Sequence, residues 1–242
     1  MARPDARAEA QIVAFTGEVR AALGDRLVAL VLHGSAAGDD WVAGRSDVNT
    51  AIVVPRVDLG VLELLAPLVA RWRERGFALP VLMDREYLAG ARDTFPMELD
   101  DIRRQHRLLA GEDVFADLVL DPRALRRECE YDARGKLLRL RALFLETART
   151  PAAIEALMAG SVKSFLIVLR HLLRLRGADH SHGYDDVLAA GETELGPLPT
   201  MRAVLGHRSG TAPLDGSALR AQFGAYLAEV ERIVEAVDAL DD

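Results

Sequence analysis

Residues 27 to 54 constrain the fold most, because two apolar runs flank a polar loop that contains glycine. The first run ends at Gly34 and Ser35, as a strand buried on both faces does when it stops at a tight turn. The second run follows Asp47 and Asn49, which stand two residues apart. Residues i and i+2 of a strand point to the same face, so we expect both side chains to project together near the turn.

A strand that ends in Gly-Ser, followed by Ser-Asp-x-Asn at the start of the next strand, resembles the polymerase-beta-like nucleotidyltransferase superfamily. The resemblance implies a mixed-sheet domain that transfers a nucleoside monophosphate from a nucleoside triphosphate to an acceptor. It implies that Gly34 and Ser35 contact the triphosphate, and that Asp47 and Asn49 hold Mg²⁺ together with a third acidic residue from a later strand. Asn49 departs from the family pattern, which usually has Asp there.

Two residues are candidates for the third acid. Asp84 stands at the end of the third predicted strand, and Glu98 is the alternative, because the step from strand to helix there would turn it inward. Each of them is also explained as a solvated residue at the end of an element. Because Asn49 is uncharged, the usual three negative metal ligands are reduced to two. A site that holds one metal ion or none is therefore an alternative to the usual two-metal site.

Lysine is rare in this sequence. Lys136 and Lys163 are the two lysines among 30 cationic residues. A compact ammonium group suits a phosphate where the planar fork of arginine does not, so Lys163 is expected to meet the triphosphate. The alternative is a solvated position on a helix face.

The order of predicted elements excludes an all-helical or an all-strand fold. The apolar spacing predicts α+β: an N-terminal nucleotidyltransferase-type mixed sheet with flanking helices, then a C-terminal all-α helical bundle. We place the two domains at residues 1–115 and 116–242. The expected N-terminal elements are helices at 5–23, 58–75 and 97–109 and strands at 26–33, 47–55 and 77–83, with Pro80 indicating an edge strand or a bulge. From Pro122 onward the expected elements are helices.

Composition narrows the environment and the partners. The net charge of −7 argues against a chain that coats nucleic acid. Cys129 is the only cysteine, which favours a reducing compartment. The N-terminal segment lacks the apolar centre of a signal peptide, and no apolar run approaches the roughly 20 residues that span a bilayer. We therefore expect a cytoplasmic protein that does not bind membranes.

Two main hypotheses follow. The first is a nucleotidyltransferase that uses ATP and Mg²⁺ on a small-molecule or protein acceptor, similar to antibiotic adenylyltransferases that also carry a helical domain. The alternative is a catalytically impaired homologue that binds a nucleotide or a partner protein, for example as an antitoxin-like module. His180 and His182 lie near Arg174 in a spacing found in helical RNase toxins, although Gly177 interrupts the segment. The sequence does not identify the acceptor, the nucleobase or the oligomeric state.

Overall fold

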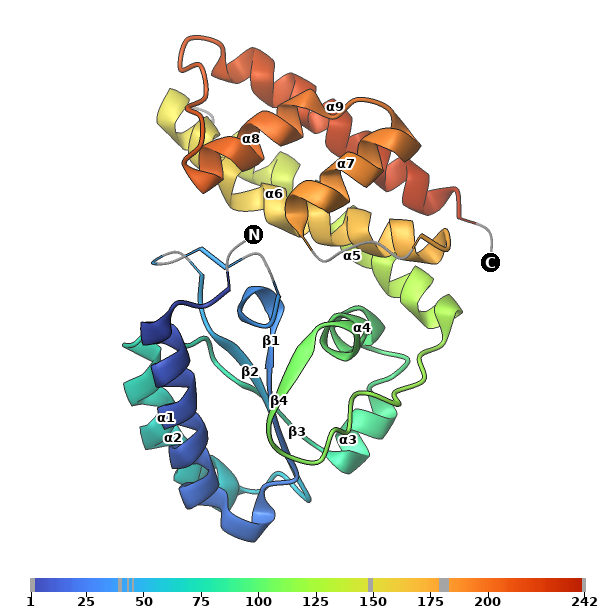
Figure 1. Ribbon diagram of the computed structural model, residues 1–242. Helices are drawn as coiled ribbons and strands as arrows, with labels where there is room; N and C mark the ends of the chain where they lie inside the picture. The colour runs from blue at the N-terminus through green and yellow to red at the C-terminus, as the bar shows by residue number, and fades with distance from the viewer. Residues whose placement is uncertain are drawn as a thin grey trace. The chain divides into compact units, whose positions relative to one another are not determined.

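The computed structural model describes residues 3–38, 41–42, 44, 46–147, 150–178 and 183–240 (Figure 1). The chain forms two compact units, Met1–Asp121 and Pro122–Asp242. The first unit contains a sheet with helices on both faces, and the second unit is helical throughout its described residues. The predicted α+β class is confirmed.

The first unit is built on a four-stranded mixed sheet in the order β3-β2-β1-β4. Strand β1 (Ala29–His33) pairs antiparallel with both β2 (Asn49–Val54) and β4 (His106–Gly111), and β2 pairs parallel with β3 (Val81–Asp84). The predicted edge position of the third strand is therefore confirmed, since β3 has β2 as its one neighbour.

Two amphipathic helices cover one face of the sheet. Helix α1 (Ala6–Leu23) begins where the Asp5 carboxylate accepts the amide of Ala8 at 2.8 Å, and it ends at Gly24. Helix α2 (Leu59–Arg73) has Asp58 as its N-cap. Their buried side chains, such as Phe15 on α1, pack with alternate residues of β1 and β2 into one apolar core.

The opposite face carries two shorter helices, α3 (Arg85–Gly90) and α4 (Pro96–Arg104). Alternate β1 residues, Ala29 and Val31, point to this face and pack in a second core with Ile102. Because both faces are covered, β1 and β2 read as continuous apolar runs in the sequence.

The predicted helix at 97–109 is wrong in its second half. Helix α4 ends at Arg104, and residues 106–111 form β4. Gln105 leaves the helical conformation, with φ −140° and ψ 83°. The open edge of β1 provides backbone partners that a longer helix would leave unused, so sheet pairing overrides the helical spacing of the apolar residues.

The third strand is shorter than the predicted 77–83. It begins at Val81, after a proline that cannot donate to the ladder. Phe77 makes only an isolated parallel bridge with Val48, and its ring packs against Phe15 and Trp72. The start of this segment therefore anchors the core rather than extending the sheet.

The second unit is arranged around helix α6 (Pro151–Leu175), which contacts the other four helices of the unit. These are α5 (Pro122–Thr147), α7 (Tyr184–Leu195), α8 (Pro199–Ser209) and α9 (Leu219–Asp238). By length and composition α6 is apolar enough to cross a membrane. Its apolar side chains are instead packed against the surrounding helices, as in the core helix of a globular unit.

A buried carboxylate on α9 holds the start of α8. Glu229 is 5% exposed and accepts the amides of Thr200 at 2.9 Å and Met201 at 2.7 Å. The residue at the N-cap of α8, Leu198, has no side-chain oxygen to do this. Glu229 therefore supplies the cap from another helix and also favours the positive end of the helix dipole.

We predict that Glu229→Ala lowers the free energy of unfolding by about 2–3 kcal/mol, because two buried amides lose a charged acceptor. Glu229→Gln keeps one acceptor oxygen and should cost less. Glu231→Ala is the control, since its exposed pair with Arg141 contributes at most about 1 kcal/mol. Urea unfolding measures all three. Equal losses for the Glu229 and Glu231 alanine variants would contradict the cross-helix cap.

Candidate functional site

The turn after β1 depends on glycine. Gly34 has φ +66°, a conformation that side chains rarely adopt, and it starts the short 3-10 helix η2 (Gly34–Ala36). The amide of Ala37 donates to the Gly34 carbonyl at 3.0 Å. The first amides of such a turn have no partner inside it, so together with the Ser35 hydroxyl they are suited to an anion.

The β1–β2 register brings this turn beside the predicted acidic motif. His33 lies directly opposite Asn49, so Gly34 is adjacent to the start of β2. A Cβ atom on Gly34 would lie 3.1 Å from Nδ2 of Asn49. Nδ2 also donates to the Asp47 carbonyl at 3.3 Å, a bond that a carboxylate at this position could not make. Asp47 itself is exposed. Four of the predicted site residues thus share one end of the sheet.

The structure does not bring Asp84 to this group. In the parallel β2–β3 pairing Asp84 lies opposite Val54, at the other end of β2 from Asn49. Its carboxylate caps α3 by accepting the Tyr87 amide at 2.8 Å and also accepts the Val57 amide at 3.1 Å. These two bonds, led by that of Tyr87, lower its pKa. Asp84 is a structural cap.

Glu98 lies in the first turn of α4 and is exposed as a residue. Desolvation of its carboxyl group raises its pKa, and the neighbouring charge of Asp101 adds to the effect. Glu98 thus has an acidic neighbour, Asp101, and its role as the third acid stays a prediction.

The strand beside Asn49 provides no acid at the level of the turn. Ala51 pairs with Val81 and Val48 bridges Phe77, so residues 78–80 lie beside Asn49 and Thr50, and none of these three residues is acidic. Among the described residues, no three His, Cys, Asp or Glu side chains are grouped so that they could hold a metal ion. The donors present there do not fit a two-metal site with three carboxylates.

Two histidines lie next to this group. His106, the first residue of β4, is opposite His33. Its ring contacts the Ile102 carbonyl through Nδ1 at 2.8 Å and Asp113 through Nε2 at 3.0 Å. Burial lowers the pKa of His33 to about 4. The two histidines are neighbours because β1 pairs with β4. The sequence predicts a helix at 97–109 in place of the start of β4, so it does not predict this pairing.

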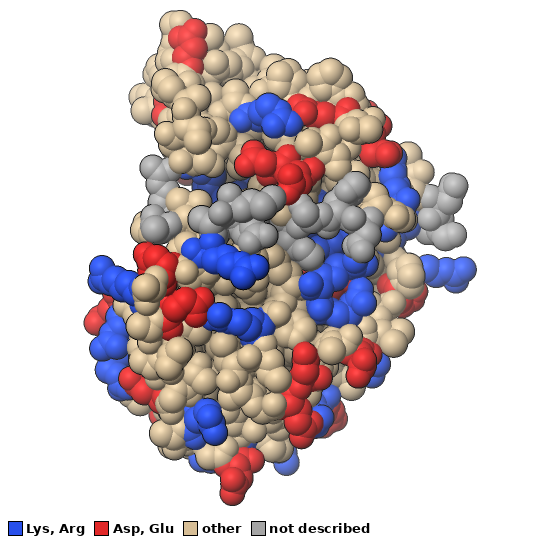
Figure 2. Space-filling model, viewed as in Figure 1, with Lys and Arg blue, Asp and Glu red and all other residues tan. Residues whose placement is uncertain are grey.

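The remaining predicted residues lie elsewhere. Lys163 belongs to α6 in the second unit, where its Nζ lies 5.0 Å from the ring centroid of Tyr184, a cation–π contact. Its role as a nucleotide ligand stays a prediction. His180 and His182 lie outside the described residues. On the face shown in Figure 2, acidic and basic side chains are interspersed.

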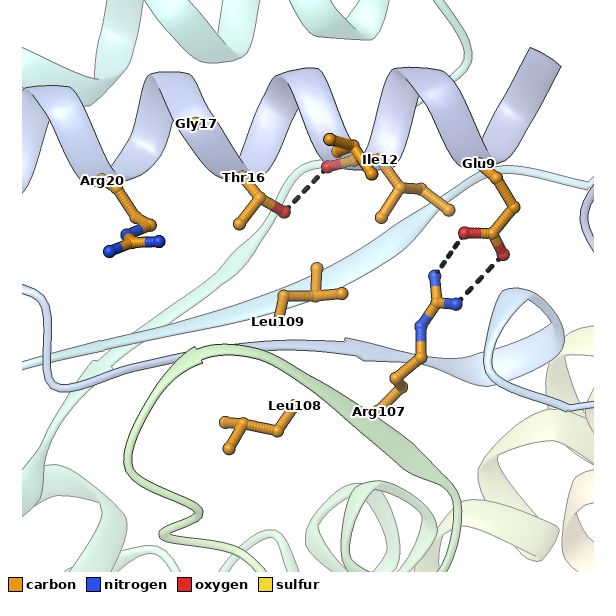
Figure 3. A pocket seen from close by; sticks show the side chains of 9 residues that line it. Glu9, Ile12, Thr16, Gly17, Arg20, Arg107, Leu108 and Leu109 are labelled. Carbon is orange, nitrogen blue, oxygen red and sulfur yellow. Dashed lines mark hydrogen bonds and ion pairs between the residues drawn. The ribbon is translucent and has the colours of Figure 1, made fainter. Parts of the chain in front are cut away.

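A separate groove of about 440 Å³ lies between α1 and the edge strand β4 (Figure 3). Glu9 and Arg107 form a two-bond ion pair across it, with distances of 3.1 and 2.9 Å. Gly17 leaves its wall open, since no atom lies within 4 Å of a Cβ placed there. The ion pair ties α1 to β4 at the sheet edge.

The lowered pKa of His33 predicts a pH-dependent stability. Between pH 6.5 and about pH 4 the unfolded chain takes up a proton that the folded chain does not, so stability falls as the pH falls through this window. The loss reaches about 3 kcal/mol at its lower end. Urea unfolding of wild type and His33→Asn over this range measures it. Equal slopes for the two proteins would contradict a neutral, buried His33.

Comparisons with known proteins find similarity among solved structures. No family model matches the sequence, and no curated protein matches it. Among solved structures, the chain is similar to spectinomycin adenyltransferase AAD(9) from Enterococcus faecialis, whose structure contains ATP and spectinomycin. The TM-score is 0.59 at 12% sequence identity, and the match covers 92% of this chain and 99% of that one. The chain therefore has a nucleotidyltransferase-like fold and resembles an antibiotic adenylyltransferase along nearly its whole length.

Proposed function

We propose that this chain binds a nucleoside triphosphate at the turn after β1, and that binding rather than nucleotidyl transfer is its main function. The observation that carries the proposal is the β1–β2 pairing, which places Asp47 and Asn49 beside the Gly34 turn, while the adjacent segment on the β3 side, residues 78–80, contains no acidic residue. The site thus keeps its turn suited to phosphate, while the described residues do not bring together the three carboxylates that transfer chemistry calls for.

The phosphate groups would be bound by the backbone amides of the turn and by the Ser35 hydroxyl. Lys163 is proposed as a further contact to the triphosphate, in agreement with the scarcity of lysine in this sequence. ATP is the proposed nucleotide, because the similar adenyltransferase structure contains ATP. Mg²⁺ is proposed only as an ion that accompanies the triphosphate, held mostly by phosphate oxygens and water with Asp47 as one protein ligand.

A second candidate function is transfer of a nucleoside monophosphate to a small molecule. It is favoured by the length of the structural match, since 92% of this chain, the helical unit included, corresponds to an enzyme whose structure contains an antibiotic acceptor. A protein acceptor and an antitoxin-like role are further alternatives. A cytoplasmic location agrees with all of these proposals.

We predict that ATP binds in calorimetry without added Mg²⁺, and that Mg²⁺ tightens binding by less than about tenfold. Ser35→Ala should weaken binding about three- to tenfold, the effect of one lost hydrogen bond to a charged group. Ser209→Ala at the end of α8 is the matched control and should leave the affinity unchanged. If ATP, GTP, CTP and UTP all fail to bind, the proposal is wrong.

We further predict that an added carboxylate restores metal dependence. Asn49→Asp should strengthen Mg²⁺-dependent ATP binding, so that Mg²⁺ tightens binding by more than about tenfold. Asp84→Asn, at the other end of β2, should not alter the metal dependence. Transfer of labelled AMP from ATP to small-molecule acceptors by the wild-type protein would instead establish the second candidate function.

A further inference from the structure

Helix α5 has a second apolar face that no described part of the chain covers. Tyr131, Leu138 and Leu145 are 82%, 65% and 85% exposed. They follow one another at intervals of seven residues on a helix of 26 residues, so they form one line along its surface. Single exposed apolar residues are common on proteins. Three large apolar residues aligned on one helix face instead indicate a surface that a partner covers.

Small residues lie between the large ones. Gly135 and Ala142 are both exposed, and together with the three large residues they give the alternating spacing of four and three residues found at coiled-coil contacts. A Cβ atom placed on Gly135 would have no neighbour within 4 Å. On a facing helix, small residues at these positions leave deep holes into which Leu138 and its neighbours can insert. We call residues 131, 135, 138, 142 and 145 the α5 seam.

We propose that α5 is a dimerisation helix, along which α5 of a second copy of this chain packs in parallel through the α5 seam. The other face of α5 contacts α6 and α9, so the helix is already folded in the single chain. Association therefore does not include the free-energy cost of forming the helix. The seam is short, spanning about 21 Å at 1.5 Å per residue, so a dimer of about micromolar affinity is expected.

The charges beside the seam select the second copy and its direction. In a parallel pair, the residue before Gly135 or Ala142, and the equivalent residue seven positions before Arg134, faces the residue five positions later on the other helix. Arg141 then faces Glu146, and Arg127 faces Asp132. Glu146 has no ion-pair partner among the described residues, so it is available to a second copy.

The antiparallel alternative is disfavoured. In an antiparallel pair, Arg134 of one helix would face Arg141 of the other, and Arg141 would face Arg134. Each of these contacts places two positive charges together. In the parallel pair the one unfavourable contact is between Arg134 and Arg139, and Arg134 is already bound to Glu130 and Asp238 of its own chain.

Sedimentation equilibrium of the full chain, over a wide range of concentrations and without nucleotide, tests the proposal. Wild type should be a dimer that dissociates on dilution, and Leu138→Glu should weaken it by at least about tenfold. Leu59→Glu is the control, because Leu59 is a leucine of similar exposure, 68%, on α2. Circular dichroism confirms that each variant is folded. A wild type that is monomeric throughout, or a dimer indifferent to Leu138→Glu, would overturn the proposal.

Charge exchange tests the direction. Arg141→Glu and Glu146→Arg should each weaken the dimer, and the double variant should regain most of the lost affinity, because the pair is then formed with its signs reversed. Arg141 also binds Glu231 in its own chain at 2.7 Å, so Glu231→Gln is the control for loss of that contact. If Arg141→Glu strengthens the dimer, the helices are antiparallel and the proposed packing is wrong.

Discussion

The antiparallel pairing of β1 with β2 is the interaction on which the candidate site depends. It sets His33 opposite Asn49, and it thereby brings a turn that only glycine adopts readily against the start of the next strand. The side chain of Asn49 lies so close to Gly34 that any larger residue at the turn would crowd it. A shift of one residue in this register would turn Asn49 to the opposite face of the sheet and separate it from the turn.

Local features of this site could be predicted from the sequence, whereas features set by strand direction could not. The apolar runs and the Gly-Ser turn lie close together in the chain, so their spacing fixes the positions of Asp47 and Asn49. The third acid depends on how a distant strand pairs. Because β3 runs parallel to β2, Asp84 at its end lies far from the turn, and the segment beside Asn49, residues 78–80, contains no acid. The same limit applies to His106, whose apolar neighbours suit a helix as well as a strand until the open edge of β1 decides.

Asn49 changes the electrostatics of the turn as well as its ligand set. Two carboxylates two residues apart on one strand face repel each other unless a cation lies between them. An amide at the second position removes that repulsion and donates a hydrogen bond to the Asp47 carbonyl. The same substitution removes one negative ligand, which weakens the electrostatic neutralisation that phosphoryl chemistry requires.

The two units carry different physical features. The turn proposed to bind phosphate belongs to the sheet of the first unit, while the α5 seam lies on the helical second unit, on the face of α5 opposite its contacts with α6 and α9. Self-association would give each assembly two nucleotide sites. If a nucleotide changes the affinity of the dimer, thermodynamic linkage requires that dimerisation change the affinity for the nucleotide by the same factor. A chain that binds a nucleotide without transferring it can act through such a coupling, because binding free energy alone is enough to shift an association equilibrium.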